Sequence, residues 1–238
     1  MIGSLQGWLD TPYLSCPAKL DQAAQQLTSV AFKDASGRTH HLLIGPGVQC
    51  IDDSGLHDVM RGEETQIWGS GLDEGAVCIL PGTHSKWAWI GKAGEIQKFR
   101  TYMTGELFAL LTKYGILGRL MKPGQDEGAF KRGVLLGRND CAHASHIIFS
   151  VRTAGLMASL PADSLSDYLS GILIGLEIGG SMALSGSLPR HIHLIGDDEL
   201  CMRYVKALHV VNIQAVMSNT TATAGLWKLA TTAGVVKA

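Results

Sequence analysis

The chain has almost no net charge and no cluster of basic residues. Its 238 residues include 20 Lys and Arg against 21 Asp and Glu, which gives a formal net charge of −1. Binding of nucleic acid through its phosphates needs a basic patch, and attraction to anionic lipid needs a basic run beside the membrane. Neither feature is present, so small molecules are the expected partners, with no nucleic acid and no membrane.

The cysteines are too few and too scattered for a disulfide framework. There are five of them, an odd number, at positions 16, 50, 78, 141 and 201, and no CxxC pair occurs. This usage is typical of free thiols in a reducing compartment. The opening residues 1–8 also lack the basic start and apolar core of a secretory signal. The cytoplasm is therefore the expected location.

A hydrophobic segment long enough to span a membrane is missing as well. The longest apolar run, residues 169–184, contains Glu177 and several glycines. It is shorter than the about 20 apolar residues that a membrane-spanning helix needs. We predict a buried helix here, with small residues at the points where neighbouring elements approach closely.

The common glycine-rich nucleotide fingerprints are also absent. Gly69, Gly71 and Gly75 do not have the dinucleotide-binding spacing, and no strand precedes them as that fingerprint requires. This spacing excludes a Rossmann interpretation.

The chain does have enough apolar residues to fill a core. Segments with the two-residue period of a strand alternate with segments that have the 3.6-residue period of a helix. Hydrophobic residues make up 46% of it and charged residues 17%, which suits one large domain or two small ones. This alternation of predicted strands and helices indicates an α/β protein with mixed strand directions. We expect strands at residues 40–44, 76–80, 86–90, 95–101, 191–196 and 213–217, helices at 63–69, 105–114, 199–208 and 221–230, and mostly helix over 125–184.

The turn between two of these strands, LPGTHSKW at residues 80–87, concentrates small and polar groups. Backbone N–H groups, two hydroxyls and a lysine at one point suit the oxygens of a phosphate. The turn is not a Walker loop, because the glycine spacing differs and a strand follows it. An ordinary hairpin loop would use the same residues for turn geometry alone, so both interpretations stay open at this point.

Two carboxylates, Glu63 and Glu64, stand at the start of the expected helix at residues 63–69. Transfer of a phosphoryl group to an alcohol needs a carboxylate that accepts the hydroxyl proton. The alternative is that both are solvated acids, which the helix dipole favours in a first turn.

Several blocks in this order resemble the 2-dehydro-3-deoxygalactonokinase family of the sugar-kinase/Hsp70/actin superfamily. Such a kinase phosphorylates 2-dehydro-3-deoxy-D-galactonate at its terminal hydroxyl to the 6-phosphate in galactonate breakdown, with ATP and Mg²⁺. The resemblance implies a two-lobed, actin-like (ribonuclease H-like) α/β fold with mixed sheets. The blocks are IGSLQGW (2–8), TPYLSCPA (11–18), VMRGEETQ (59–66), LPGTHSKW (80–87), FRTYMTGELFALL (99–111), YLSGILIGLE (168–177) and HLIGDDELCMRY (193–204).

The resemblance also implies roles for individual residues. Glu63 is the expected general base, with Glu64 as its substitute. Arg61 and Arg100 are candidates for the substrate carboxylate, because a guanidinium binds a carboxylate through two hydrogen bonds; a surface ion pair is the alternative for Arg100. The nucleotide is assigned to Gly82, Thr83, His84, Ser85 and Lys86, and to Gly196 and Asp197 of an adenosine motif, while the sugar acid is assigned to Ser4, Trp8, Arg61, Arg100 and Thr104.

The sequence departs from the family pattern at its start. Family members begin with an Asp-x-Gly-Thr/Ser-Thr hairpin that forms the first phosphate loop, and no such motif occurs in the 238 residues. We expect an incomplete first lobe at residues 1–61, on the sugar-acid side, and a second lobe at 62–238, on the nucleotide side, with a cleft between them. The chain is then the truncated record of a kinase, a short form that binds sugar acid or nucleotide without transfer, or an inactive remnant.

Other reactive side chains are given structural roles. His191 and His193 alternate on a strand, but no carboxylate or cysteine set accompanies them at ligand spacing, so no metal site is predicted. Cys78 lies in an apolar strand and is expected to be a buried thiol. A homodimer is one candidate assembly for the chain, whose sequence does not determine the oligomeric state.

Overall fold

The computed structural model describes residues 9–185, 189–218 and 220–237 of the chain. Their contacts group the chain into two compact units. Of the described residues, unit 1 takes 9–78, 88–101, 218 and 220–237, and unit 2 takes 79–87, 102–185 and 189–217. The predicted boundary between residues 61 and 62 falls inside unit 1, and the assignment of 1–61 and 62–238 to two lobes stays a prediction.

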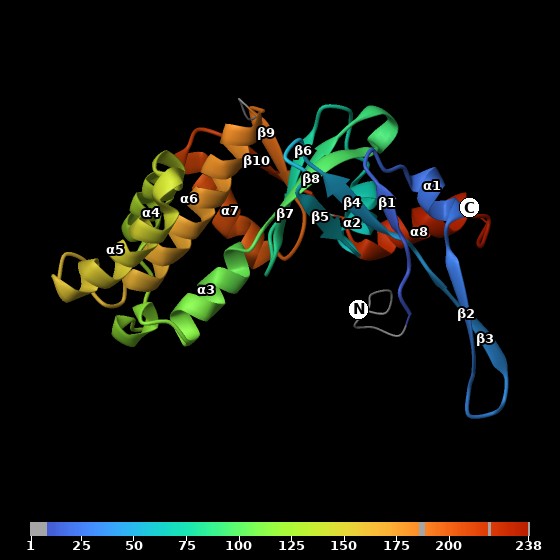
Figure 1. Cartoon of the computed structure of the whole chain (residues 1–238), viewed down its shortest axis with the longest axis horizontal. Coiled ribbons are helices and arrows are strands. Elements are labelled where there is room, and N and C mark those ends of the chain that lie inside the picture. Colours follow the sequence, from blue (N-terminus) through green and yellow to red (C-terminus); the bar gives the residue numbers. More distant parts are fainter. Residues whose placement is uncertain (1–8, 186–188, 219, 238) are drawn as a thin grey trace. The chain divides into compact units, whose positions relative to one another are not determined.

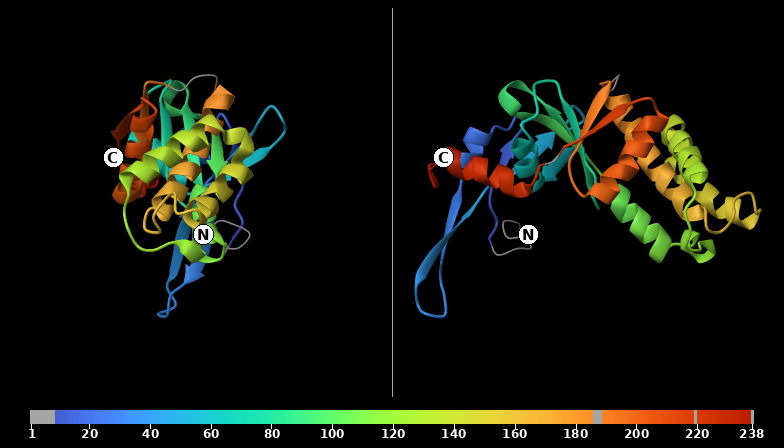
Figure 2. Two further views of the ribbon diagram at one scale, coloured as in Figure 1. Left: turned by 90° about the vertical axis from the view of Figure 1, so that its left-hand side faces the viewer. Right: turned by 180° about the vertical axis from the view of Figure 1, so that it is seen from behind.

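Unit 1 holds a three-stranded sheet in the order β1-β4-β5. β1 (Tyr13–Ser15) is parallel to β4 (Gly47–Ile51), which is antiparallel to β5 (His57–Met60). The antiparallel pair β2 (Thr28–Lys33) and β3 (Thr39–Ile44) forms a long hairpin that extends away from the rest of this unit (Figures 1 and 2).

Three helices complete unit 1: α1 (Leu20–Gln25), α2 (Glu63–Ser70) and α8 (Ala222–Thr232). α2 and α8 pack so closely that a Cβ atom at Gly225 would lie 1.6 Å from the carbonyl oxygen of Thr65. Only a glycine fits at this crossing.

A five-stranded sheet has the order β10-β9-β6-β7-β8. Its strands are β6 (Val77–Leu80), β7 (Ser85–Ile90), β8 (Ile96–Tyr102), β9 (His191–Leu194) and β10 (Gln214–Met217). β9 and β10 are parallel, with Ile192 opposite Ala215. Together with the sheets of unit 1, this confirms a mixed α/β architecture with both strand directions.

Helices make up most of unit 2. They are α3 (Thr104–Lys113), α4 (Glu127–Asn139), α5 (Ala144–Leu156), α6 (Leu165–Ser185) and α7 (Asp198–Val210), with a short 3-10 turn at Leu117–Leu120. α6 is the apolar run noted in the sequence, and Leu169, Ile172 and Ile178 on it are fully buried. The prediction of a buried helix is confirmed.

Glycines bring α4 and α6 into backbone contact. A Cβ atom at Gly133 or Gly137 of α4 would lie 2.3 Å from the Tyr168 oxygen or 2.2 Å from the Ile172 oxygen. Gly171 and Gly175 of α6 meet backbone carbonyls of α4 at similar distances. The prediction that small residues mark a close approach is therefore also confirmed.

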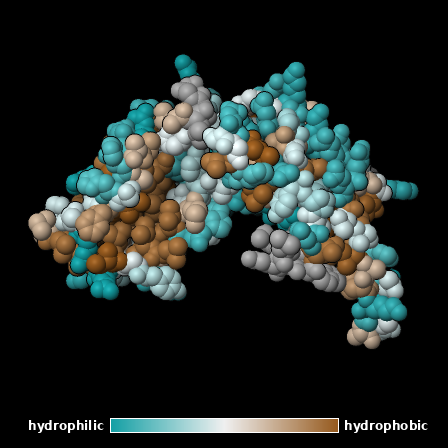
Figure 3. Space-filling view, in the orientation of Figure 1, coloured by the Kyte–Doolittle hydropathy of each residue, from teal (hydrophilic) through white to brown (hydrophobic). Residues whose placement is uncertain are grey.

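One face of unit 2 carries exposed apolar side chains around α3 and α5 (Figure 3). Among the exposed large hydrophobic side chains of these two helices are Leu110 of α3 and Phe149 and Leu156 of α5. Among the described residues, none of the helices combines the length and the hydropathy that crossing a bilayer would require.

The strands and helices predicted from periodicity are all found, within a few residues of their predicted ends. The prediction misses most of the first 60 residues, where only the strand at residues 40–44 is expected. β1, β4 and β5 are three to five residues long, so each is too short to show an alternating pattern.

Candidate functional site

The turn between β6 and β7 lies in unit 2, where Thr83 and His84 are exposed and Gly82 is half-buried. Ser85 and Lys86, where β7 begins, are buried, and the Lys86 ammonium donates to the His84 carbonyl at 3.2 Å. The tip of the turn therefore faces solvent, and the residues that follow point into the unit.

The first turn of α3 packs directly against this loop. The Glu106 backbone N–H donates to the Thr83 carbonyl at 2.9 Å. A Cβ atom at Gly105 would lie 2.4 Å from the Gly82 oxygen, so a glycine is needed for the approach. His84 Nε2 and Glu106 Oε2 lie 2.5 Å apart on the outer side of the contact. The loop and the positive end of α3 are thus held together as one piece.

A pocket of about 390 Å³ opens beside the loop, entirely within unit 2. One wall is the loop and the start of α3, and the other walls come from α6 and α7. Its lining is apolar around Phe108, Leu173 and Ile174, with polar groups at its edge. A cavity that combines apolar side chains with polar groups able to orient a ligand is typical of small-molecule sites. The polar lining residues are Thr83, Thr104, Ser166, Asp167, Ser170, Arg203 and Tyr204.

An arginine at the edge of this pocket is held in place by three contacts. Arg203 on α7 donates to Asp167 at 2.6 Å and to Ser170 at 2.7 Å. Its guanidinium also lies 4.5 Å from the centre of the Phe130 ring. The other Asp167 oxygen accepts the Asp126 backbone N–H at 2.5 Å, which ties the α4 N-terminus to α6. This network does not follow from the sequence, because its members lie far apart in the chain.

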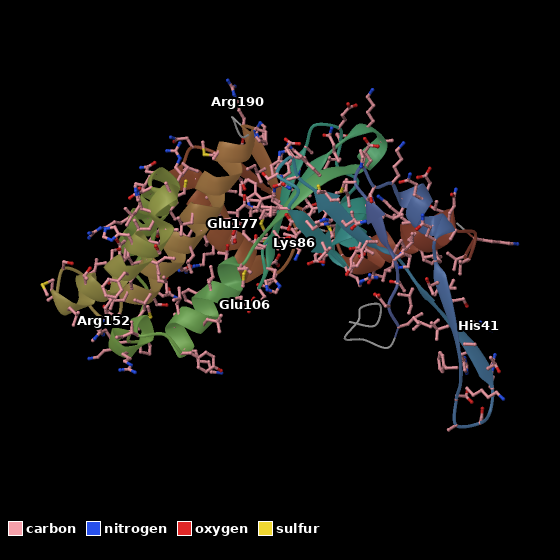
Figure 4. The ribbon with its side chains drawn as sticks, in the orientation of Figure 1. His41, Lys86, Glu106, Arg152, Glu177 and Arg190 are labelled. Atoms are coloured by element: carbon pink, nitrogen blue, oxygen red, sulfur yellow. The ribbon has the colours of Figure 1, made fainter. Side chains whose placement is uncertain are left out.

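The second site feature is a buried carboxylate, Glu177 on α6, which is 1% exposed. Figure 4 shows it beside the start of β7, near Lys86, and above the start of α3, near Glu106. Its oxygens accept four hydrogen bonds: from the Ser85 hydroxyl at 2.7 Å, the Trp87 indole N–H at 2.6 Å, the Thr104 hydroxyl at 2.5 Å and the Tyr204 hydroxyl at 2.7 Å.

Burial raises the pKa of Glu177, and the four donors act in the opposite direction. Burial also raises the pKa of Tyr204 well above its usual value, which keeps this hydroxyl protonated as a donor. Sequence reasoning treated Glu177 only as a charge that interrupts the apolar run. A lone acid in a helix of buried residues is itself a signal, because such a charge is retained only when it is paired.

The predicted adenosine motif lies where β9 leads into α7. Gly196 has φ +148°, a conformation that other residues rarely adopt, and it is exposed. Asp197 caps α7 by accepting the Leu200 N–H at 3.0 Å. The glycine therefore lets the backbone turn sharply, and it leaves the N-terminus of α7 open to solvent.

The paired carboxylates lie in unit 1, at the N-terminus of α2. Glu64 is 4% exposed and accepts the Gly62 N–H at 2.6 Å, and Glu63 is half-buried and accepts the Arg61 N–H at 3.1 Å. Burial raises the pKa of Glu64 to about 7. Only Glu64 is therefore taken out of solvent by the fold.

The two predicted carboxylate-binding arginines are both engaged within unit 1. Arg61 donates to the Thr11 hydroxyl and, at 2.7 Å, to the Thr11 carbonyl, and its guanidinium lies 4.4 Å from the centre of the Tyr13 ring. Arg100 pairs with Asp52 at 3.2 Å, and the two side chains are only 20% and 10% exposed, so this contact differs from the surface ion pair considered for Arg100. Ser4 and Trp8, also predicted to bind the sugar acid, lie outside the described residues.

Two further predictions concern single side chains. Cys78 is buried, as expected, and burial raises the pKa of its thiol to about 12, so this cysteine is not a nucleophile at neutral pH. Thr104, predicted to bind the sugar acid, donates its hydroxyl to Glu177.

Known proteins with similar sequences and structures are sugar-acid kinases. The family model described as 2-keto-3-deoxy-galactonokinase matches residues 1–229. The 2-dehydro-3-deoxygalactonokinase of Escherichia coli (strain K12) is 36% identical over 234 residues, which are 97% of this chain and 76% of that protein. A Rhizobium meliloti (strain 1021) protein named a probable 2-dehydro-3-deoxygalactonokinase is 36% identical over 236 residues, or 95% of this chain and 74% of that protein.

A solved structure agrees with these matches. The crystal structure of a candidate 2-dehydro-3-deoxygalactonokinase from Sinorhizobium meliloti superimposes with a TM-score of 0.88 at 33% identity. The match covers 100% of this chain and 79% of that one. The chain thus belongs to the 2-keto-3-deoxy-galactonokinase family.

Proposed function

We propose that the chain phosphorylates 2-dehydro-3-deoxy-D-galactonate at its terminal hydroxyl, with ATP as the phosphoryl donor, in galactonate breakdown. Membership of the family supports this assignment. The observation that carries it is the loop at Gly82 and Thr83, which is fixed on the start of α3 beside a pocket of about 390 Å³. Such a loop can present backbone N–H groups to phosphate oxygens while the pocket takes an apolar ring.

In this proposal, unit 2 binds the nucleotide. The phosphates contact Gly82, Thr83 and His84, the exposed part of the turn. The adenosine lies near Gly196 and Asp197. Ser85 and Lys86 are buried, so direct contact between these two residues and a phosphate stays a prediction. Mg²⁺ is usually held by phosphate oxygens, water and one or two carboxylates, so it would arrive with the nucleotide.

Unit 1 supplies the groups for the sugar acid. Glu63 remains the proposed general base, because its half-buried side chain stands at the first position of α2. Glu64 is the substitute, since a pKa of about 7 is matched to proton transfer near neutral pH. Arg61 and Arg100 would bind the substrate carboxylate only with guanidinium hydrogens that Thr11 and Asp52 leave available.

We further propose a two-lobed, actin-like ATPase fold, with the lobes at residues 1–61 and 62–238 as predicted from the sequence. Closure of lobes over ATP and acceptor would exclude water, because hydrolysis competes with transfer. A cytoplasmic location and a homodimer remain predictions.

The direct test is conversion of ATP to ADP that depends on added 2-dehydro-3-deoxygalactonate. The gluconate-derived acid, which differs at one hydroxyl, reports epimer specificity in the same assay. No turnover with the galactonate-derived acid would overturn the proposed function. If ATP or the galactonate-derived acid then raised the melting temperature without turnover, the chain would be a binding protein instead.

The base is identified by replacing each candidate with glutamine. Loss of the general base is expected to lower kcat about 10²- to 10⁴-fold, so Glu63→Gln should show this loss and Glu64→Gln a smaller one. Glu74→Gln is the matched control, because Glu74 is an exposed glutamate of the same unit. Unchanged kcat in both Glu63→Gln and Glu64→Gln would rule out this assignment of the base.

A further inference from the structure

The donors to Glu177 come from the elements that surround the loop. Ser85 and Trp87 lie on β7 directly after it, Thr104 is the first residue of α3, and Tyr204 belongs to α7. Two donors bind each carboxylate oxygen: Ser85 and Trp87 bind Oε1, and Thr104 and Tyr204 bind Oε2. One side chain of α6 therefore joins three separate elements.

Two of these donors also form the wall of the pocket. Thr104 and Tyr204 line it together with Gly82 and Thr83. If Glu177 released them, α3 and α7 would be free to shift relative to the loop. The hydrogen bond from the Glu106 N–H to the Thr83 oxygen would then weaken, because Glu106 is only two residues from Thr104 and would move with it.

Burying a carboxylate costs free energy, because its charge must be removed from water. Replacing a buried charge together with its partners by apolar residues of similar volume is often neutral or stabilising, so packing alone does not explain why this charged group and its donors are present. A fully satisfied polar network does select one arrangement of its donors, because each hydrogen bond is directional. The arrangement selected here is that of the loop and two walls of the pocket.

We propose that Glu177 is a positioning residue for phosphoryl transfer, which fixes the Gly82–Thr83 turn relative to α3 and α7 so that the nucleotide phosphates meet preformed donors. This inference rests on the proposed function. Glu177 itself touches no substrate in this role, because it is buried behind Ser85 and Thr104.

The test compares Glu177→Gln with Ser181→Ala. Glutamine keeps the size of the side chain and removes the charge. Ser181 is a fully buried polar residue one turn further along α6, and its hydroxyl donates to the Tyr102 hydroxyl at 2.8 Å, so the control also loses one partly buried hydrogen bond. Trp87→Phe is the second variant, which removes a single donor and keeps an aromatic ring in case Glu177→Gln does not fold.

Two readouts are needed. In steady-state assays, kcat/KM for ATP should fall about 100-fold in Glu177→Gln, since small misplacements at a reacting centre have effects of this size, and KM for the sugar acid should stay unchanged. In hydrogen exchange of the ligand-free protein, the Glu106 amide should exchange about tenfold faster in Glu177→Gln. Trp87→Phe should change both readouts in the same direction by less, and Ser181→Ala should change neither.

The exchange readout separates this inference from the proposed function. If the wild-type chain has no kinase activity but loses Glu106 protection in Glu177→Gln, the function fails and the structural part of the inference stands. Unchanged Glu106 exchange in Glu177→Gln and Trp87→Phe overturns the inference. So does an equal fall in kcat/KM for ATP in Ser181→Ala, because that result assigns the effect to general destabilisation.

Discussion

Glu64 in unit 1 and Glu177 in unit 2 are both buried carboxylates, and the fold satisfies them differently. Glu64 accepts a hydrogen bond from the Gly62 backbone and lines a pocket whose other residues are mostly apolar, among them Leu42 and Leu226. Glu177 accepts hydrogen bonds from four side chains. Burial raises the pKa of both carboxyls. The difference separates an acid whose protonation can change from an acid that organises its neighbours.

The largest expected difference between the two carboxylates is in the stability that the protein loses when each is replaced by leucine. Glu177→Leu leaves four donors without an acceptor, of which Ser85, Trp87 and Tyr204 are fully buried, and each unpaired buried donor costs about 1–3 kcal/mol. We expect the free energy of unfolding to fall by on the order of 4 kcal/mol or more, or the variant not to fold at all. Glu64→Leu removes a buried charge and leaves no buried side-chain donor unpaired, since the donors to Glu64 are backbone N–H groups at the start of α2, so the change in unfolding free energy should stay within about 2 kcal/mol. Urea unfolding at pH 8 measures both losses. Equal losses would contradict the conclusion that the fold depends more on Glu177 than on Glu64.

The second prediction concerns pH. The pKa of Glu64 is raised from 4.5 to about 7 in the folded chain, so between these values the folded state binds the proton more tightly than the unfolded state. The stabilisation from this proton is complete below about pH 4.5 and is lost as the pH rises through 7, with a total of about 3 kcal/mol.

The measurement is the free energy of unfolding between pH 5 and 8 for the wild type and for Glu64→Gln. The wild type should lose more stability over this range, and the difference between the two curves isolates Glu64. Parallel curves would show that Glu64 does not titrate in this range.

A smaller effect is expected from Tyr204→Phe. The substitution removes one of the four donors to Glu177 and keeps the ring, and a net hydrogen bond contributes about 0.5–1.5 kcal/mol, or somewhat more to a charged group. In Glu177→Gln the same substitution should cost less, because the acceptor is no longer charged. A double-mutant cycle measured by urea unfolding tests this, and additive effects would mean that Tyr204 and Glu177 are not coupled.

The smallest effect should come from an exposed pair near the same loop. His84 and Glu106 lie 2.5 Å apart, with side chains 48% and 36% exposed. Exposed pairs contribute about 0–1 kcal/mol and are screened by salt. Glu106→Gln should therefore change the melting temperature little, and any change should disappear in high salt. A change as large as that of Tyr204→Phe would contradict the distinction between buried and exposed acids.

The same two carboxylates show how much of the site is predictable from sequence. The turn at residues 80–87 and the helix at Glu63 follow from local patterns, because alternation, glycine and first-turn acids act over a few residues. The partners of Glu177 do not, since Ser85 and Tyr204 lie 92 and 27 residues away along the chain. The strands β1, β4 and β5 are not predicted either, but for a local reason: each is too short to show an alternating pattern.

The glycine contacts between α4 and α6 have a consequence for how unit 2 folds. Each glycine in a helix interior lowers helix propensity by about 1 kcal/mol relative to alanine, and both helices carry several, among them Gly133 and Gly137 on α4 and Gly171 and Gly175 on α6. Neither segment should hold its helical shape while the other is unfolded. The two are therefore expected to become helical in one cooperative event, when their backbones meet.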